Sequence, residues 1–433
     1  MFEKYDAYKD SGVDWIGEIP NHWCVEKSKW LFSLRKEKAL KNEEQLTASQ
    51  KYGMIPQNEF MALEGRRVTQ VEFNSEILKH VEKGDFVISM RSFQGGLEYS
   101  EYTGSVSSAY VALKPITGIF SLFFKYLFKS QRYIEALQST SNLVRDGQAL
   151  RYDNFCMVDL FLPPIEEQMK IANFLNQRII DIDQAIAIKE QQIALLNERK
   201  QIVIQKAVTQ GLDPNVPMKD SGVEWIGQIP EYWELKKIKH VTSKIGSGVT
   251  PSGGGATYLD EGIPLLRSQN IHFNRIDLND VARISEKVHH SMSNSKVRKN
   301  DVLLNITGGS IGRCYFVETS EEMNVNQHVC ILRPKKNISS IFLNAVLASE
   351  VGQGQIWYFQ QGGGREGLNF QALKNFDIAL PPIEEQILIS KKVEEIYQQF
   401  GNMNAHIQMQ IEKLKEYKTT LINDAVTGKI KVA

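Results

Sequence analysis

Cysteine is scarce in this 433-residue sequence, and the four residues present show no CxxC spacing. Their scarcity argues against both a zinc site and a disulfide framework. Long apolar runs are also missing, because none reaches the ~18 residues that a membrane-spanning helix needs. The N-terminal sequence MFEKYDAYKD has no apolar core of the kind that a signal peptide carries. The composition therefore predicts a cytoplasmic protein without a membrane segment.

Catalytic signatures are missing as well. The glycine-rich segments 246–255 and 307–312 lack the lysine of a phosphate-binding loop. No H-E-x-x-H is present, and His289 and His290 have no third ligand at metal-binding spacing. No G-x-S-x-G is present either. An enzyme of this length usually shows one such signature, so the sequence favours a protein that binds rather than catalyses.

The net charge is zero, with 51 basic and 51 acidic residues, so the total gives no direct sign of a nucleic-acid partner. The charges are unevenly distributed. Residues 235–380 carry 17 Lys and Arg against 12 Asp and Glu, whereas residues 24–161 carry 18 against 16. Ordinary surface scatter explains the smaller excess, and charge alone gives slight support to a basic binding face.

The chain repeats itself at long period. Residues 9–23 read KDSGVDWIGEIPNHW, and residues 219–233 read KDSGVEWIGQIPEYW. The heptapeptide LPPIEEQ begins at Leu162 and again at Leu380. Self-similarity of this kind indicates a duplicated architecture. The segments between the repeated blocks hardly resemble each other, which suits a molecule that reads two different things with one scaffold.

Each segment between the repeated blocks has the pattern of a mixed α and β domain. Helical patterns lie at 120–139 and 341–358. Strands are predicted where β-branched and apolar residues gather in short runs, at 85–89, 109–113, 301–305 and 328–332.

A long helix is predicted after each LPPIEEQ, since proline is tolerated in a first helical turn and paired glutamates favour the positive end of a helix. Apolar residues then recur at 3/4 spacing over about four heptads. At 1.5 Å per residue, each helix of roughly 45 residues would span about 65–70 Å. The seam positions are Ile179, Ile182, Ile186, Lys189, Ile193, Leu196, Lys200, Val203 and Ala207 in one copy, and Tyr397, Phe400, Asn404, Ile407, Ile411, Leu414, Lys418, Leu421 and Ala425 in the other.

Two such seams in one chain suggest that the helices pack on each other. The alternative is that each stripe packs on its own domain, but a narrow stripe of this length outruns a small domain. If a pseudo-twofold axis relates the halves, the helices lie antiparallel and the domains sit at opposite ends. Lys200 and Lys418 occupy equivalent seam positions, where a lysine without a partner is costly. These two side chains either snorkel to solvent or fix the register.

Polar side chains cluster near glycines and predicted strand ends in both variable segments. Arginine can pair bidentately with guanine, and Asn or Gln with adenine. Glycine-rich loops let backbone amides approach phosphates. Turn formation explains many of these residues equally well. The candidate DNA-binding residues are Arg66, Arg67, Arg91, Gln94 and Arg145 in the first segment, and Arg267, Gln269, Asn270, Asn305, Arg313, Gln327 and Arg365 in the second.

These motifs, in this order and twice over, resemble the specificity subunit of type I restriction-modification systems. The resemblance covers nearly the whole chain. The second variable segment also resembles the family's target-recognition domain, through GVTP at 248–251, IPLLRSQNI at 263–271, GGSIG at 308–312 and NQ at 326–327. The first segment lacks the GxTP and NQ marks and resembles a different subclass of the same domain.

The resemblance implies a fold and a function. The expected fold class is α+β, with two mixed α/β target-recognition domains separated by two long antiparallel coiled-coil helices in a pseudo-twofold internal repeat. The expected divisions are 1–161, 162–211, 212–379 and 380–433, for the first domain, the first helix, the second domain and the second helix.

The resemblance also implies partners. Each domain would read one half of a bipartite, asymmetric site in double-stranded DNA, while the paired helices set the spacer and dock two methyltransferase subunits. Restriction and translocase subunits would join that core. No cofactor is expected in this chain; S-adenosylmethionine, ATP and magnesium would sit on the partner subunits.

Two rival interpretations belong to other classes. A stand-alone restriction or modification enzyme would carry a catalytic signature such as an aromatic-ended N/D-P-P motif, which the two LPPI sequences do not match. A coiled-coil adaptor would carry similar domains at both ends, whereas these two differ.

Overall fold

The computed structural model describes residues 2–65, 67–68, 77–89, 92–140, 150–251, 258–360 and 367–432, apart from the side chains of residues 93 and 94. The chain divides into two compact units. Unit 1 comprises Met1–Lys189 with Met409–Ala433, and unit 2 comprises Glu190–Gln408. Each unit therefore contains one mixed domain and parts of both long helices, α7 (Ile165–Gln210) and α13 (Ile383–Val426).

Unit 1 is built on a four-stranded sheet in the order β4–β11–β8–β9. The helix predicted at 120–139 is two helices: the first ends at Leu127, and the Ser130 hydroxyl accepts the Tyr133 amide at the start of the second. The elements before α7 are β1 (Tyr8–Asp10), β2 (Glu18–Pro20), β3 (Cys24–Lys27), α1 (Ser28–Leu31), β4 (Phe32–Leu34), β5 (Leu46–Ser49), β6 (Gly53–Pro56), α2 (Gln57–Glu64), β7 (Lys79–Val81), β8 (Phe86–Ile88), α3 (Ser92–Gly95), β9 (Glu98–Tyr99), β10 (Gly104–Val106), β11 (Val111–Pro115), α4 (Ser121–Leu127), α5 (Gln131–Ser139), α6 (Tyr152–Cys156) and β12 (Asp159–Leu162).

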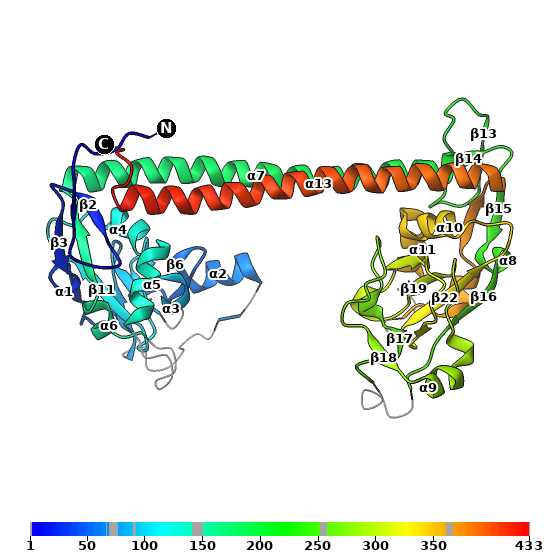
Figure 1. The fold of residues 1–433 in the computed structure, drawn as a ribbon, viewed down its shortest axis with the longest axis horizontal. Coiled ribbons are helices and arrows are strands. Elements are labelled where there is room, and N and C mark those ends of the chain that lie inside the picture. The colour runs from blue at the N-terminus through cyan, green and yellow to red at the C-terminus, as the bar shows by residue number, and fades with distance from the viewer. Residues whose placement is uncertain are drawn as a thin grey trace. The chain divides into compact units, whose positions relative to one another are not determined.

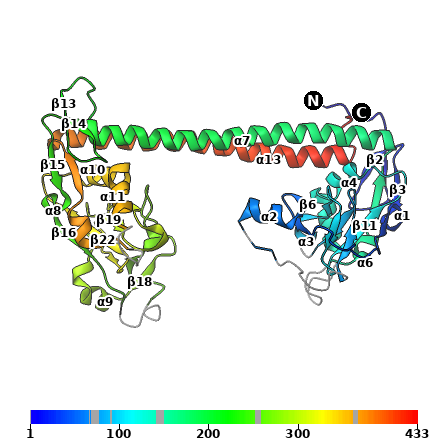
Figure 2. The same cartoon turned by 180° about the vertical axis from the view of Figure 1, so that it is seen from behind.

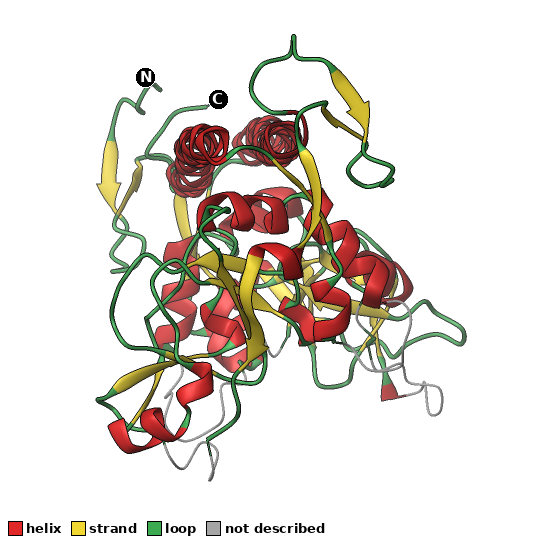
Figure 3. Cartoon of the chain, turned by 90° about the vertical axis from the view of Figure 1, so that its right-hand side faces the viewer, coloured by secondary structure: helices red, strands yellow, loops and turns green. Residues whose placement is uncertain are grey.

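Unit 2 is built on a four-stranded sheet in the order β16–β22–β19–β20. The helix predicted at 341–358 is again two helices, with the extended residue Ser349 between them. The elements before α13 are β13 (Met218–Asp220), β14 (Gln228–Pro230), β15 (Glu234–Lys237), α8 (Ile238–Val241), β16 (Thr242–Ser247), β17 (Ile263–Leu266), β18 (Ala282–Ile284), α9 (Glu286–Ser291), β19 (Val302–Asn305), β20 (Cys314–Phe316), β21 (Asn324–Val325), β22 (Val329–Pro334), α10 (Ser340–Ala348), α11 (Glu350–Gln360), α12 (Phe370–Lys374) and β23 (Asp377–Leu380), with short 3-10 turns at Ser268–Asn270, Ser293–Ser295 and Gly308–Ser310. Figure 3 shows the helices and strands of the chain in separate colours.

The two sheets share one topology although their sequences differ. β4, β11 and β8 of unit 1 correspond in order to β16, β22 and β19 of unit 2, and every neighbouring pair is antiparallel. The strand that opens each domain also pairs with the strand that closes it, β3 with β12 and β15 with β23. The internal repeat of the sequence therefore extends through the fold of the variable segments, and the expected α+β class is confirmed.

In each copy, the repeated tryptophan and the repeated LPPIEEQ are joined by a hydrogen bond. Trp23 is fully buried and its indole N–H donates to the Glu167 carboxylate at 3.0 Å. Trp233 is equally buried and donates to Glu385 at 3.0 Å. The second glutamate of each pair therefore anchors the start of a long helix on the hairpin that precedes each domain. Because a buried indole N–H needs an acceptor, the two motifs depend on each other.

The last residue of each LPPIEEQ ties the helix start to its domain. Gln168 donates to the Pro163 carbonyl at 2.8 Å and accepts the Phe120 amide at 2.9 Å. Gln386 makes the same pair of bonds, with Pro381 and with the Ser339 amide. Both glutamine side chains are buried. They satisfy amides at the first turns of α4 and α10, which otherwise lack intrahelical partners.

The long helices pack on each other along the predicted seams, which confirms their pairing. All the seam residues are buried or partly buried, and the helices lie side by side within each unit (Figures 1 and 2). As residue numbers rise along α7 their partners fall along α13, so the pair is antiparallel in both units. The contacts that establish this are Asp183 with Lys418 and Lys189 with Gln410 in unit 1, and Asn197 with Asn404 and Lys200 with Tyr397 in unit 2.

The two seam lysines both reach a partner. The Lys418 ammonium donates to both carboxylate oxygens of Asp183, at 2.7 and 2.8 Å. The Lys200 ammonium lies 5.7 Å from the centre of the Tyr397 ring, and burial lowers its pKa. Lys418 thus extends to a half-exposed carboxylate at the edge of the helix pair, as the snorkelling alternative expects.

Candidate nucleic-acid interface

Loops of unit 2 converge at one end of its main sheet. The register pairs Ser247 with Cys330 and Asn305 with Val329. β16 and β19 therefore end where β22 begins, and the segments that leave them share this end. We call residues 248–251, 267–270, 305–313 and 326–328 the loop cluster. They contain most of the residues that the sequence predicted to bind DNA in this half of the chain.

Gly248 sets the path of the first loop. A Cβ atom at this position would lie 1.7 Å from the Val325 carbonyl oxygen, so no other residue fits without a backbone shift. The Gly248 amide donates to the Asn326 carbonyl at 3.1 Å. This close approach brings Thr250 to Gln327, whose carbonyl oxygen accepts the threonine hydroxyl at 2.6 Å. The GVTP and NQ motifs thus meet in space.

A chain of side-chain hydrogen bonds orients Gln327. Its amide nitrogen lies 3.0 Å from His328 Nε2, and His328 Nδ1 lies 2.6 Å from the Thr307 hydroxyl. Because an amide nitrogen can only donate, Nε2 accepts and the proton of a neutral His328 sits on Nδ1. Gln327 is exposed, so this network presents a glutamine amide in a defined orientation at the surface. An amide held in this way can pair with the edge of an adenine.

Asn270 and Asn305 hold the loop cluster together from within. Asn270 is 2% exposed; it donates to the Asp277 carbonyl and accepts the Arg267 amide. Asn305 is fully buried and donates to the Ser268 carbonyl at 2.8 Å and to the Ser310 hydroxyl. Both were predicted to contact DNA, yet their donors face inward. We therefore assign them a positioning role and place the candidate contacts on their neighbours.

Three of those neighbours reach the surface of the loop cluster. Gln269 is exposed, while Arg267 and Arg313 are partly exposed. The Arg267 guanidinium lies 5.6 Å from the centre of the Tyr258 ring. Within the described parts of the chain neither arginine forms a salt bridge, so both can offer their charge to a phosphate or a guanine.

The remaining predictions fall largely outside the described residues. Arg67 is exposed just beyond α2, whereas Arg66, Arg91, Arg145 and Arg365 lie outside the described residues, and only the backbone of Gln94, within α3, is described.

The end of strand β8 in unit 1 lies close in sequence to two of the predicted residues, Arg91 and Gln94. β8 ends at Ile88, opposite Val111 where β11 begins. Ser89 directly follows β8, so it lies at the end of the unit 1 sheet that corresponds to the loop cluster in unit 2.

Sequence reasoning missed the threonines and the histidine of the hydrogen-bond chain. Thr250 lies inside the GVTP motif and His328 directly follows NQ. Their position in or next to these motifs could have identified them as site residues. Thr307 directly precedes the GGSIG motif and follows the end of β19 by two residues. No group of three or more metal-ligating side chains occurs in the described ranges, nor is any described helix long and apolar enough to cross a membrane.

The chain belongs to a known family. The model of the type I restriction modification DNA specificity domain matches it twice, at residues 20–198 and 230–413. Family membership places the chain among specificity subunits rather than among catalytic subunits.

Curated relatives carry the same designation. The type I restriction enzyme EcoBI specificity subunit of Escherichia coli is 29% identical over 62% of this chain, an alignment that spans 58% of that protein. The MjaVIII specificity subunit of Methanocaldococcus jannaschii is 26% identical over 83% of this chain and 81% of its own length.

Solved structures agree on the fold. A chain from work on complex assembly and conformational transition of the type I R-M system has a TM-score of 0.67 at 14% identity, covering 94% of this chain and 98% of that one. The HsdS subunit from Thermoanaerobacter tengcongensis has a TM-score of 0.54 at 16% identity, covering 95% and 98%.

Proposed function

We propose that the chain is the DNA-specificity subunit of a type I restriction-modification complex. Each unit uses the loops at one end of its main sheet to read one half of a bipartite, asymmetric site in double-stranded DNA. The observation that carries the proposal is a repeated sheet topology with different side chains at the equivalent end. Unit 2 presents the chain Thr250–Gln327–His328–Thr307 there, whereas in unit 1 Ser89 follows the corresponding strand, β8, at that end.

The chemistry of the loop cluster supports base reading in unit 2. Gln327 is oriented by neighbours on both sides, so little conformational freedom is lost when it pairs with a base edge. Arg267 and Arg313 lie in the same loop cluster and form no salt bridge among the described residues, and arginine pairs bidentately with guanine or binds phosphate. One good bidentate base contact contributes about 1–3 kcal/mol of discrimination.

The partner subunits supply the chemistry in this proposal. The antiparallel helices α7 and α13 set the spacer between half-sites and dock two methyltransferase subunits, which use S-adenosylmethionine. Restriction and translocase subunits that use ATP and magnesium join this core. The absence of recognised catalytic motifs in the sequence is consistent with that division of labour. A stand-alone enzyme or a coiled-coil adaptor would not need two differing domains.

Methylome sequencing of a host with and without this gene tests the proposal. A bipartite adenine-methylated motif should appear only with the gene, and the purified chain alone should not transfer labelled methyl groups to DNA. Gln327→Ala should relax one position in one half of the motif, while Gln371→Ala, an exposed glutamine on α12, should leave it unchanged. Methyl transfer by the chain alone, or a motif unaffected by the gene, would overturn the proposal.

A further inference from the structure

A basic cleft lies at the other end of the unit 2 sheet. The register pairs Lys244 with Arg333, and Asp301 immediately precedes β19 beside them. Lys244 and Arg333 line a cleft of about 500 Å³. The other cations that line it come from the segment before β19 and are Lys296, Arg298 and Lys299. The cleft is separated from the loop cluster by the length of the strands.

Positive charge is in excess in the basic cleft. Arg333 is neutralised, because its guanidinium binds Asp301 through two bonds of 2.8 Å. Within the described residues the other four cations form no salt bridge, and Glu321 and Glu322 are the only carboxylates among the lining side chains. Burial and the nearby Arg333 charge lower the pKa of Lys244. The four cations without a salt bridge repel one another, so a bound anion would relieve a standing repulsion.

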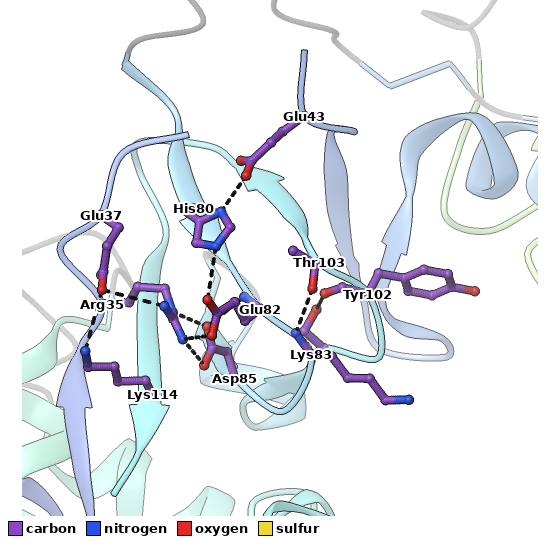
Figure 4. Close-up of polar contacts among 11 residues, drawn as sticks. Arg35, Glu37, Glu43, His80, Glu82, Lys83, Asp85, Tyr102, Thr103 and Lys114 are labelled. Atoms are coloured by element: carbon purple, nitrogen blue, oxygen red, sulfur yellow. Dashed lines mark hydrogen bonds and ion pairs between the residues drawn. The ribbon is translucent and has the colours of Figure 1, made fainter. Parts of the chain in front are cut away.

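Unit 1 neutralises the equivalent place. There Leu113 pairs with Phe86 as Leu332 pairs with Val302, so Asp85 and Lys114 correspond to Asp301 and Arg333. Figure 4 shows the ion pairs that fill this position. Arg35 binds Asp85, Glu82 and Glu37, Lys114 binds Glu37, and His80 lies between Glu43 and Glu82.

The two sheet ends therefore differ in their charge balance. Carboxylates outnumber permanent cations in the unit 1 cluster, whereas cations outnumber carboxylates in the basic cleft. The excess in unit 2 is thus a property of its side chains and not of the shared sheet topology.

We propose that the basic cleft binds phosphate groups. The inference goes beyond the proposed function, which assigns DNA to the loop cluster, and does not rest on it. Ammonium and guanidinium groups from three chain segments face one concave space, as a tetrahedral anion requires. No aromatic ring occurs among the described side chains that line the cleft, so recognition concerns the phosphate and not an attached base. The phosphate comes either from a nucleic-acid backbone or from a free phosphoanion.

Two charge-matched variants test the proposal in the full chain. Lys296→Gln, Arg298→Gln and Lys299→Gln together remove three cations from the basic cleft. Lys36→Gln, Lys38→Gln and Lys114→Gln remove three from unit 1 and serve as the control. Four of the six residues are exposed, and Lys296 and Lys114 are partly exposed, so both variants should fold, which thermal melting checks. If the cleft variant melts early, the charge reversal Lys299→Glu at an exposed position replaces it.

The two probes are a 20-base-pair duplex of arbitrary sequence, followed by fluorescence anisotropy across salt concentrations, and pyrophosphate, followed by calorimetry. If the source is a nucleic-acid backbone, the cleft variant binds the duplex more weakly and its log–log salt slope falls by about 2–3, at ~0.9 per phosphate lost. The control variant keeps the wild-type slope.

If the source is free phosphate, the cleft variant loses pyrophosphate binding while duplex binding stays unchanged. If the cleft variant and the control variant bind the duplex equally, with the same salt slope, and also bind pyrophosphate equally, the proposal is overturned. The methylated motif reports separately on the loop cluster, so failure of this inference is distinguishable from failure of the proposed function.

Discussion

Replacing Glu167 by alanine should loosen the anchor between the first hairpin and helix α7. The carboxylate accepts the Trp23 indole N–H and the Tyr5 hydroxyl, each at 3.0 Å, and lies 2.5 Å from His22. Trp23 has no exposed surface, so its N–H would be left buried without a partner. A hydrogen bond to a charged group contributes about 1.5–3 kcal/mol. We expect a loss of about 2–3 kcal/mol.

Glu166→Ala is the matched control, since Glu166 is exposed on the same helical turn and keeps the same relation to the helix dipole. Its loss should cost no more than about 0.3–1 kcal/mol. Hydrogen exchange measured by mass spectrometry on peptides covering residues 18–27 reports the local opening. Exchange there should accelerate by about 30- to 150-fold in Glu167→Ala, since 1.36 kcal/mol is a factor of ten. Peptides covering residues 228–237 should not change. Equal acceleration in the two variants would refute the anchoring role.

Three further predictions concern other parts of the chain. Gly248→Ala should destabilise unit 2 by about 1–3 kcal/mol in urea unfolding, because the added Cβ meets a backbone carbonyl, whereas Gly246→Ala, with open space around it, should be nearly neutral. Cys24 is exposed and should react rapidly with a thiol reagent. Burial raises the pKa of Cys330 to about 12 and should keep this thiol unreactive until the protein unfolds. Early labelling of Cys330 in a Cys24→Ser variant would count against this. Lys418→Gln should cost less than about 1 kcal/mol, and the cost should shrink at high salt, because the ion pair is partly exposed.

The long helices were predictable because their signal is local. A seam at 3/4 spacing reports helix packing directly, and the contact of Lys418 with Asp183 needs only the antiparallel direction in addition. The repeated blocks were equally visible. The bond from Trp23 to Glu167 was not, although both residues lie inside recognised motifs, because 144 residues separate them. Nothing in the spacing of either motif indicates that contact.

The candidate site was predictable in outline and not in detail. Asn270 and Asn305 sit beside glycines and strand ends, as surface-binding residues do, yet the structure uses their amides inside the loop cluster. Residue type cannot separate these roles, since an asparagine satisfies backbone groups and base edges with the same atoms. The shared strand order of the two sheets could not be predicted from the sequence either. Strands that pair in a sheet are far apart in the sequence, and many different apolar segments are compatible with the same strand order. Comparing the two variable segments by sequence therefore does not reveal their common topology.

Methylome sequencing after a segment exchange tests the central claim most directly. Residues 27–159 of this chain would be replaced by the corresponding segment of a relative with a different recognised site. The chimera retains Trp23 and Glu167, so the anchor of α7 on its hairpin is kept. If each unit reads its own half-site, one half of the methylated motif should change while the other half and the spacer stay the same. If the complex that contains the chimera methylates DNA with both halves of the motif altered, the account is contradicted.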